Sequence, residues 1–490
     1  MSAARRSHSR AVAALLTFLL ATASADVAPA AGIARPERAS VAASSANAEP
    51  TTSSATWFPP DSAVRSILAA RVEAGQAIGL VVGLLENGET RIVTVGKSGG
   101  PGERPLDGAT VFEIGSVTKV FTTTLLADMA RRGEVRLDQP VAELLPRSVK
   151  VPAKGDTLIT LLDLATQHSG LPRLPSNLAP KDPANPYADY TVDRLYDFLS
   201  HHTLTRAPGA VYEYSNLGMG LLGHALARKA GKSYEAVLTE RVLKPLGMND
   251  TRITLTADMK ARLAAGHDPA GAVVGNWDFA ALAGAGALRS TAADMLRFIA
   301  ANLDSNATPT SADLRETHRP RHTAGGPNVS IGLAWHLLHS FGAEIVMHNG
   351  GTGGCRSFVG YDPARRVGVV VLSNSSGDVD DLALHLLNPK FPLKQVVKHN
   401  EVKLDPARLE ALVGRYALAP TFILTVTREG EGLFIQATGQ PRLPVFAESD
   451  STFFYKAVEA QVWFGRDETG TVTRLVLHQN GRDLPGTRLP

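Results

Sequence analysis

"SVTKVFTTTLLADMARRGEV", residues 116–135, is the stretch that most constrains the fold and chemistry of this chain. Its apolar residues recur at helical spacing and Gly133 is a typical helix stop, so it predicts a helix with Ser116 at or next to its first turn. Lys119 then lies one turn away on the same face. A helix N-terminus favours negative charge on a serine oxygen, and a lysine with a lowered pKa can take the serine's proton. The stretch therefore suggests a nucleophilic serine.

A second serine, Ser98, lies in a Gly-x-Ser-x-Gly pattern over residues 96–100. In a nucleophile elbow that pattern joins a strand to a helix that begins at once. Here the following residues, 100–108, read "GPGERPLDG", and their glycines and prolines make an immediate helix improbable. We therefore expect Ser98 to end a strand in a loop, which leaves Ser116 as the candidate nucleophile.

Two further motifs offer partners for Ser116. Tyr214-Ser215-Asn216 precedes a glycine-rich helix start. A tyrosine there could act as a general base if nearby cations lower its pKa, while the amide of Asn216 can hydrogen-bond a substrate carbonyl. The alternative is a buried aromatic residue followed by an asparagine helix cap.

The later motif is His348-Asn349-Gly350-Gly351, at the end of a predicted strand. Its glycines would let a substrate backbone approach the strand edge, and an N–H group there could complete an oxyanion hole with that of Ser116. His348 could orient a substrate carboxylate or relay a proton. The alternative is a strand-end histidine followed by a flexible turn.

Strand patterns lie on both sides of the long, mostly helical region that starts at Ser116. A helix is expected over residues 61–75, then a hairpin that turns at Asn87-Gly88. Strands return later in the chain, at residues 332–338, 343–350, 356–363 and 366–376. This order predicts an α+β fold, in which one antiparallel sheet is completed by sequence-distant segments, flanked by helices and joined to an all-helical insert.

The end of the chain has a different pattern. After a short helix near residue 406, alternating strands with Gly-centred turns fill the rest of residues 400–490 and predict a small all-β barrel or sandwich. We find no credible catalytic grouping or metal-ligand cluster in this segment.

Together, Ser-x-x-Lys at Ser116, Tyr-x-Asn at Tyr214 and His-x-Gly at His348 resemble the serine β-lactamase and penicillin-binding-protein superfamily. The similarity is to the branch that contains class C β-lactamases, DD-peptidases, D-aminopeptidases and related esterases. "ITLLDLATQHSGLP" and "APGAVYEYSNLGMGLLGHAL" also resemble that branch, in its order, and the resemblance covers about residues 57–390. The final β domain is similar to lipocalin-like modules of some members, which is a weaker match.

The resemblance implies an acyl-enzyme mechanism without a metal or cofactor. Ser116 would attack an amide, ester or β-lactam carbonyl, and the proton-transfer network would be formed by Lys119 and Tyr214, with the identity of the base left open. The oxyanion would be bound by the N–H groups of Ser116 and Gly351. The remaining substrate contacts would come from Asn216, which would bind the acyl side chain, and from His348 and Gly350.

The resemblance also leaves several functions open. Class C β-lactamases usually carry Lys-Thr-Gly where this chain has His348-Asn349-Gly350, and histidine there is more typical of peptidase and esterase members. We therefore expect hydrolysis of amide bonds in D-amino-acid peptides, such as cell-wall fragments. The alternatives are a β-lactamase, an esterase on small acyl esters, and a non-catalytic penicillin-binding or sensor protein that keeps the fold.

The beginning of the chain resembles an export signal. Three arginines precede a short apolar run, and Ala23-Ser24-Ala25 is typical of a cleavage site, so residues 1–25 are expected to be a signal peptide for a periplasmic or secreted protein. Residues 26–56 are rich in Ala, Ser, Pro and Thr and are expected to be a flexible linker.

Removing the leader also removes the net charge. The whole chain has 50 Lys and Arg against 47 Asp and Glu, and the leader holds three arginines and no acids. The mature chain is then formally neutral, which gives no support to nucleic-acid binding. Cys355 is the single cysteine, so no intramolecular disulfide can form, and we expect it to be a small buried strand residue.

Overall fold

The computed structural model describes residues 56–490, apart from positions 101, 305, 307, 441, 457, 459, 480 and 481. The expected signal peptide and the linker, up to residue 55, lie outside the described residues. Among the described residues, no helix combines the length and the apolar character needed to cross a membrane.

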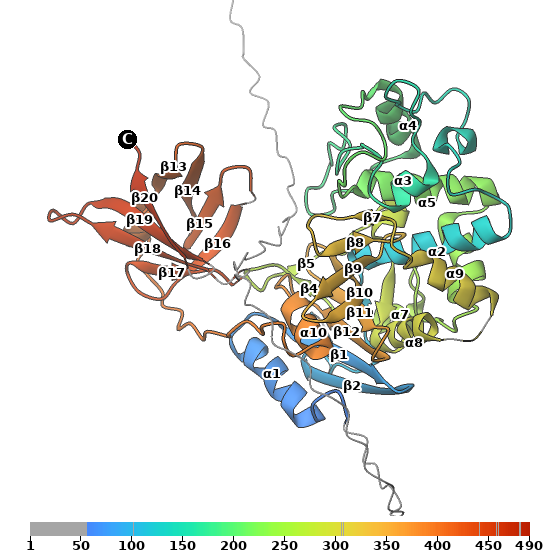
Figure 1. The fold of residues 1–490 in the computed structure, drawn as a ribbon. Coiled ribbons are helices and arrows are strands. Elements are labelled where there is room, and N and C mark those ends of the chain that lie inside the picture. Colours follow the sequence, from blue (N-terminus) through green and yellow to red (C-terminus); the bar gives the residue numbers. More distant parts are fainter. Residues whose placement is uncertain are drawn as a thin grey trace, which may run out of the picture.

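An eight-stranded antiparallel sheet forms the centre of the larger part of the molecule (Figure 1). Its strand order is β2-β1-β12-β11-β10-β9-β8-β7, so the N-terminal hairpin pairs directly with a strand near residue 370. The strands are β1 (Gly79–Glu86), β2 (Glu89–Gly96), β7 (His322–Thr323), β8 (Val329–Ile331), β9 (His336–Ser340), β10 (Ala343–Gly351), β11 (Arg356–Asp362) and β12 (Val367–Ser373). The predicted sheet, completed by sequence-distant segments, is confirmed.

Turn chemistry explains how two of the hairpins form. Asn87 and Gly88 join β1 to β2 with φ angles of 52° and 85°, the positive pair that a two-residue hairpin turn requires. The strand expected over residues 332–338 begins only at His336. Ile331 pairs with His336, so the residues between them form the turn, in which Ala334 has a φ of 64°.

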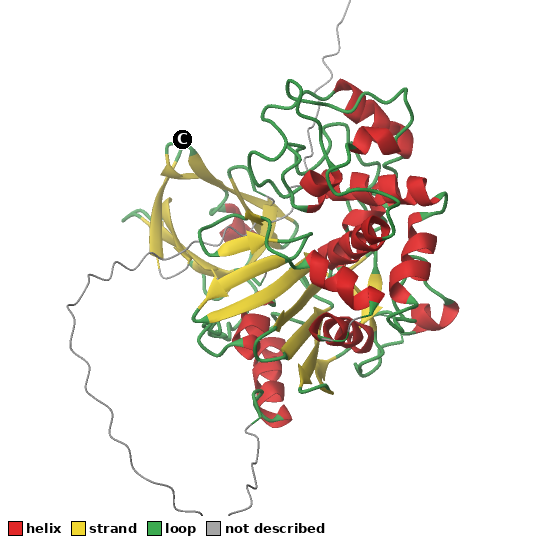
Figure 2. Ribbon diagram, turned by 45° about the vertical axis from the view of Figure 1, so that its right-hand side comes forward, coloured by secondary structure: helices red, strands yellow, loops and turns green. Residues whose placement is uncertain are grey.

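Both faces of the sheet are covered, because neighbouring residues of its central strands belong to different apolar cores. Val370 of β12 belongs to the core shared with the helical region, whereas Val369 and Val371 belong to the opposite core. That second core is closed by α1 (Asp61–Glu73) and α10 (Asp380–Leu387). Figure 2 shows the sheet between its helices. Strands buried on both faces read as continuous apolar runs, as β12 does.

The region between β2 and β7 is mostly helical, as expected. It contains α2 (Thr118–Arg131), α3 (Leu161–Ala165), α4 (Val192–His201), α5 (Asn216–Ala230), α6 (Tyr234–Leu238), α7 (Ala257–Ala261), α8 (Ala292–Leu303), α9 (Pro309–Thr317), and the short turns η1 (Gly115–Val117), η2 (Val141–Leu144), η3 (Thr239–Leu243) and η4 (Ala280–Ala285). Two small strand pairs interrupt it: β3 (Val111–Glu113) with β6 (Arg289–Thr291), and β4 (Gly266–His267) with β5 (Val273–Val274).

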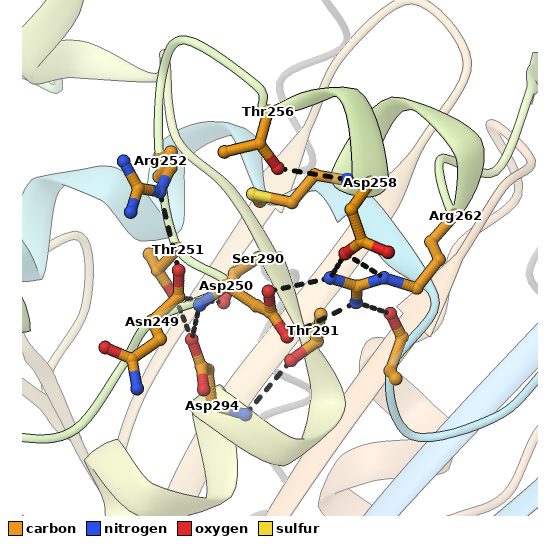
Figure 3. A network of polar contacts seen from close by, with 12 residues as sticks. Asn249, Asp250, Thr251, Arg252, Thr256, Asp258, Arg262, Ser290, Thr291 and Asp294 are labelled. Carbon is orange, nitrogen blue, oxygen red and sulfur yellow. Dashed lines mark hydrogen bonds and ion pairs between the residues drawn. The ribbon is translucent and has the colours of Figure 1, made fainter.

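A polar network anchors the β3–β6 pair, which leads directly to Ser116 (Figure 3). Asp294 of α8 accepts hydrogen bonds from the backbone of Asp250 and the hydroxyl of Thr251, at 2.8 and 2.9 Å. Arg262 pairs with Asp250 at 2.7 Å, so the same segment is also tied to the end of α7. Thr251 and Asp294 are buried and each of these groups has a partner, so the network holds the loops around β3 in one arrangement.

The C-terminal segment forms a closed barrel, which confirms the all-β prediction (Figure 1). Each strand pairs with the next, and β20 closes on β13. The barrel follows α11 (Pro406–Glu410) and consists of β13 (Gly414–Ala419), β14 (Phe422–Glu429), β15 (Gly432–Ala437), β16 (Arg442–Ala447), β17 (Thr452–Phe454), β18 (Ala460–Arg466), β19 (Val472–Gln479) and β20 (Arg482–Arg488). Its apolar side chains form a core of their own.

Candidate active site

Ser116 lies in the single turn η1, directly before α2, as the helical spacing predicted. Lys119 follows in the first turn of α2, and its Nζ is 3.0 Å from the Oγ of Ser116. Ser116 is partly exposed, whereas Lys119 is fully buried. The serine is therefore accessible to a substrate, and the lysine contacts it from the protein interior.

Lys119 has two further partners, and both come from distant parts of the chain. Its Nζ is 2.9 Å from Oδ1 of Asn216 and 2.7 Å from the carbonyl oxygen of Ala285 in η4. Burial, with a smaller contribution from the Arg173 guanidinium, holds the pKa of Lys119 well below its ordinary value of 10.5. A neutral amine can donate to Asn216 and Ala285 and accept the hydrogen of the Ser116 hydroxyl, so all three contacts suit a lysine that acts as a base.

Strand β10 meets Ser116 where its pairing with β9 stops. The β9–β10 register ends at Met347 opposite His336, and η1 packs beside the residues that follow. A Cβ at Gly350 would lie 2.1 Å from the carbonyl oxygen of Ile114 and 3.0 Å from the nitrogen of Ser116, so only glycine fits.

The same close packing brings two backbone N–H groups together. Gly115 has a φ of 47°, and a Cβ there would lie 2.8 Å from the nitrogen of Gly351. The nitrogens of Ser116 and Gly351 therefore lie in one small region, which is the arrangement expected for an oxyanion hole.

The segment with Tyr214 and Asn216 is pinned to the loop after α3. Ser215 caps α5 by accepting from the backbone of Gly218, and its hydroxyl donates to the carbonyl of Pro172 at 2.7 Å. The backbone nitrogen of Asn216 donates to the carbonyl of Arg173 at 3.0 Å. These bonds hold Asn216 where its amide reaches Lys119 on one side and the hydroxyl of Tyr187, at 3.2 Å, on the other.

Tyr214 lies beside two basic side chains and the candidate nucleophile. Its ring centre is 4.8 Å from the Nζ of Lys119 and 5.0 Å from the Cζ of Arg173, and its hydroxyl shares a hydrogen bond with Ser116. Burial nevertheless raises the pKa of Tyr214 to about 12, because desolvation outweighs the hydrogen bond and the Arg173 charge. Tyr214 is therefore protonated at neutral pH.

His348 faces Tyr214 from β10, with 6.4 Å between the ring centres. It is buried, and its Nδ1 is 2.6 Å from the carbonyl oxygen of Asn349, so Nδ1 carries the hydrogen. Its Nε2 has no hydrogen-bond partner among the described residues. Burial, with smaller contributions from His336 and Lys119, holds the pKa of His348 well below 6.5. The side chain is therefore a neutral imidazole with a free acceptor nitrogen.

The structure brings together Ser116, Lys119, Tyr214, Asn216, His348, Gly350 and Gly351, and it places Ser98 apart from them. No helix follows Ser98 before η1, and its buried hydroxyl accepts from the backbone of Arg104 at 3.0 Å. Cys355 is buried as expected, but it lies in the turn between β10 and β11, not in a strand. Its backbone carbonyl closes that turn by accepting from Thr352.

Sequence reasoning missed three contributors to the site: Arg173, the Ala285 carbonyl and Tyr187. A backbone carbonyl leaves no signal in the sequence. Arg173 directly follows the "HSGLP" stretch, and this position next to a family motif could have marked it as a site residue. Sequence reasoning also missed two residues behind His348. The hydroxyl of Tyr212 is 2.9 Å from Nε2 of His336, and the ring centre of His336 is 5.4 Å from that of His348.

Comparisons with known proteins place this chain in one family. A beta-lactamase family model matches residues 64–388, and a model of a domain of unknown function (DUF3471) matches residues 398–488. The chain belongs to the beta-lactamase family and is a serine hydrolase of the kind that includes beta-lactamases and DD-carboxypeptidases.

The individual relatives include both carboxypeptidases and beta-lactamases. The chain is 32% identical over 302 residues to the D-alanyl-D-alanine-carboxypeptidase/endopeptidase AmpH of Escherichia coli, with 57% of this chain and 77% of that protein covered. It is 27% identical over 333 residues to a beta-lactamase of Pseudomonas fluorescens, with 61% and 88% covered.

Solved structures agree with this relationship. A class C beta-lactamase from Rhodobacter sphaeroides superimposes with a TM-score of 0.56 at 27% identity, over 64% of this chain and 94% of that one. A beta-lactamase/D-alanine carboxypeptidase from Yersinia pestis, complexed with citrate, gives a TM-score of 0.57 at 26% identity, over 65% and 94%.

Proposed function

We propose that this protein hydrolyses amide bonds of D-amino-acid peptides through an acyl-enzyme on Ser116. The 3.0 Å contact between the Ser116 hydroxyl and the buried Lys119, whose pKa burial holds well below 10.5, carries the acyl-enzyme part of the proposal. The preference for peptides rests on the neutral His348 and on the similarity to AmpH, a D-alanyl-D-alanine-carboxypeptidase/endopeptidase.

Acylation begins when Lys119 takes the hydrogen of the Ser116 hydroxyl while Oγ bonds to the substrate carbonyl carbon. Negative charge moves to the carbonyl oxygen, where the N–H groups of Ser116 and Gly351 would stabilise it. We assign the base role to Lys119 instead of Tyr214, because burial lowers the pKa of the lysine and raises that of the tyrosine. A phenolate base would require a pH near 12.

Collapse of the tetrahedral intermediate requires a proton on the leaving nitrogen. Tyr214 is protonated, hydrogen-bonded to Ser116 and close to Lys119, so it can donate that proton and be reprotonated by the lysine. The C–N bond breaks, the amine leaves and Ser116 holds the acyl group as an ester. Water then attacks the ester, gives a proton to the same pair, and releases the acid and the free serine hydroxyl.

A second candidate function is hydrolysis of β-lactam antibiotics, which the beta-lactamase relatives support. Both substrates acylate the same serine, and they differ in how readily water releases the acyl group.

The two functions are separated by measuring turnover of a chromogenic cephalosporin, a D-Ala-D-Ala peptide and a nitrophenyl ester side by side. We expect peptide turnover to exceed cephalosporin turnover. Rapid cephalosporin turnover with an inert peptide would reverse the ranking.

Two parts of the proposal concern the rest of the chain. We propose that the protein is exported, from the pattern of residues 1–25, and that the hydrolase and barrel domains correspond to about residues 57–390 and 400–490. Export is tested by sequencing the N-terminus of the protein recovered from the periplasm or medium, where we expect it to begin at Asp26.

A further inference from the structure

Arg173 holds a positive charge beside the candidate site, and no carboxylate of the described residues pairs with it. Its guanidinium carbon lies 5.0 Å from the ring centre of Tyr214, and its buried Nε has no hydrogen-bond partner. A guanidinium that is stacked on an aromatic ring keeps its N–H edge free for a planar anion.

The backbone of Arg173 is fixed by the N-terminus of α5. Its carbonyl accepts from the nitrogens of Asn216 and Leu217, at 3.0 and 3.3 Å, and the preceding carbonyl of Pro172 accepts from Ser215. The same segment therefore sets the positions of Arg173 and Asn216. Little conformational entropy is left to lose when a ligand contacts the arginine.

Two acids from adjoining segments of the chain already have other partners. Glu213 precedes Tyr214 in the chain, yet it forms an ion pair with Arg206. Asp163 is held in the capping box of α3, where it accepts from Thr160. Neither carboxylate neutralises Arg173, so its charge is available to an incoming anion.

The other basic groups around the site already have partners or are neutral. Lys119 is buried and has Ser116, Asn216 and Ala285 as partners, and His348 is neutral. Arg356 donates through one Nη to the carbonyls of Thr352 and Cys355, at 3.1 Å each.

Asn349, the middle residue of the His-x-Gly segment, is already bound to a carboxyl group of the protein. Asn349 donates its amide hydrogen bond to Asp380. Burial raises the pKa of Asp380 to about 7. The contact therefore occupies the amide of Asn349, which is not free for a substrate anion, whereas the N–H edge of Arg173 is free.

We propose that Arg173 binds a carboxylate of the substrate, and that preferred substrates carry this carboxylate within about two residues of the bond that is cleaved. The limit of two residues follows from the distance between Lys119 and Arg173. The Nζ of Lys119 and the guanidinium carbon of Arg173 both lie within 5.0 Å of the ring centre of Tyr214, and an extended residue spans about 3.5 Å. This inference rests on the proposed acyl-enzyme function and names its substrate class.

Two pairs of substrates test the proposal and locate the carboxylate. In the first pair a D-Ala-D-Ala peptide ends in a free carboxylate or in an amide, which changes the leaving part alone. In the second pair the nitrophenyl ester of glutaric acid carries either the free acid or the amide at its far end, which changes the acyl part alone. The measured quantity is the ratio of kcat/KM for acid over amide within each pair.

The variants are Arg173→Gln, Arg173→Lys and, as a control that also removes one positive charge, Arg408→Gln on the exposed surface of α11. Wild type should prefer the acid in at least one pair. Arg173→Gln should lower that ratio by about tenfold or more, with Arg173→Lys in between, since a charge-assisted hydrogen bond is lost. Arg408→Gln should leave the ratio unchanged.

The ratio separates substrate binding from an indirect effect on Lys119. The Arg173 charge also lowers the pKa of Lys119, and its loss changes acid and amide substrates equally, so that effect cancels in the ratio. A folded Arg173→Gln protein with an unchanged ratio in both pairs, or a wild type without acid preference in either, would overturn the inference. Inert peptides with unaltered ester behaviour would instead count against the proposed peptidase function.

Discussion

The Nζ of Lys119 and the carbonyl oxygen of Ala285 lie 2.7 Å apart, although 166 positions separate them in the chain. Ala285 and Asn216 are two of the three hydrogen-bond partners of the lysine nitrogen, and the third is Ser116. The position of Lys119 beside the candidate nucleophile therefore depends on η4, which is distant from Ser116 in the chain.

Replacing the two competing serines should have opposite effects. Ser116→Ala should abolish turnover and covalent labelling by a fluorescent penicillin, because the attacking oxygen is gone. Ser98→Ala should leave both nearly unchanged and lower stability by about 1 kcal/mol, since a buried hydroxyl acceptor is lost. Labelling is read on a denaturing gel and by mass spectrometry. An adduct that survives in Ser116→Ala would sink the acyl-enzyme proposal.

The pH profile should report Lys119 as the base. Its neutral form is the active one, so the rate rises as pH increases through the lowered pKa of the lysine and then levels off well below 10.5. If the phenolate of Tyr214 were the base, the rate would keep rising toward pH 12. The measurement is kcat/KM for an uncharged ester between about pH 5 and 10. Lys119→Arg should be inactive throughout, because a guanidinium does not give up its proton.

Tyr214→Phe should slow peptide hydrolysis far more than ester hydrolysis. An amide nitrogen must be protonated before it leaves, so losing the donor should cost about a hundredfold or more. A nitrophenolate leaves without a proton and should be affected much less. Both rates are measured on the same preparation. Equal losses for the two substrates would contradict a role limited to protonating the leaving nitrogen.

His348→Lys should shift the preference toward cephalosporins. A lysine would place a cation in the segment where class C β-lactamases usually carry one, and a charge-assisted hydrogen bond to the antibiotic's carboxylate is worth roughly a tenfold change in the ratio of cephalosporin to peptide turnover. His348→Gln keeps the position neutral and serves as the matched control. A ratio that moves equally in both variants would show that packing, and not charge, sets the preference.

Ending the chain after residue 395 should leave hydrolysis of small esters close to wild type. The apolar core of the barrel contains none of the residues of the two cores around the sheet, so its loss opens neither of them. Comparing small esters with large peptides shows whether the barrel contributes to substrate selection. Loss of small-ester turnover in a folded truncated protein would contradict the separation of the two domains.

The local elements of the fold were readable from the residues themselves. The helix after Ser116, the turn at Asn87-Gly88 and the loop at Ser98 depend on periodicity and on the conformations of glycine, proline and asparagine. These are properties of a few consecutive residues. Strand ends were less secure, as the turn before His336 shows, because pairing and not composition decides where a strand begins.

The sequence by itself determined the family pattern of the chain and favoured Ser116 over Ser98 as the candidate nucleophile. Only the tertiary structure showed that burial lowers the pKa of Lys119 and raises that of Tyr214, and that Arg173 has no carboxylate partner among the described residues. The reason is physical. A motif names which groups are present, but a pKa and a free charge depend on desolvation and on neighbours that arrive from distant parts of the chain, such as the Ala285 carbonyl.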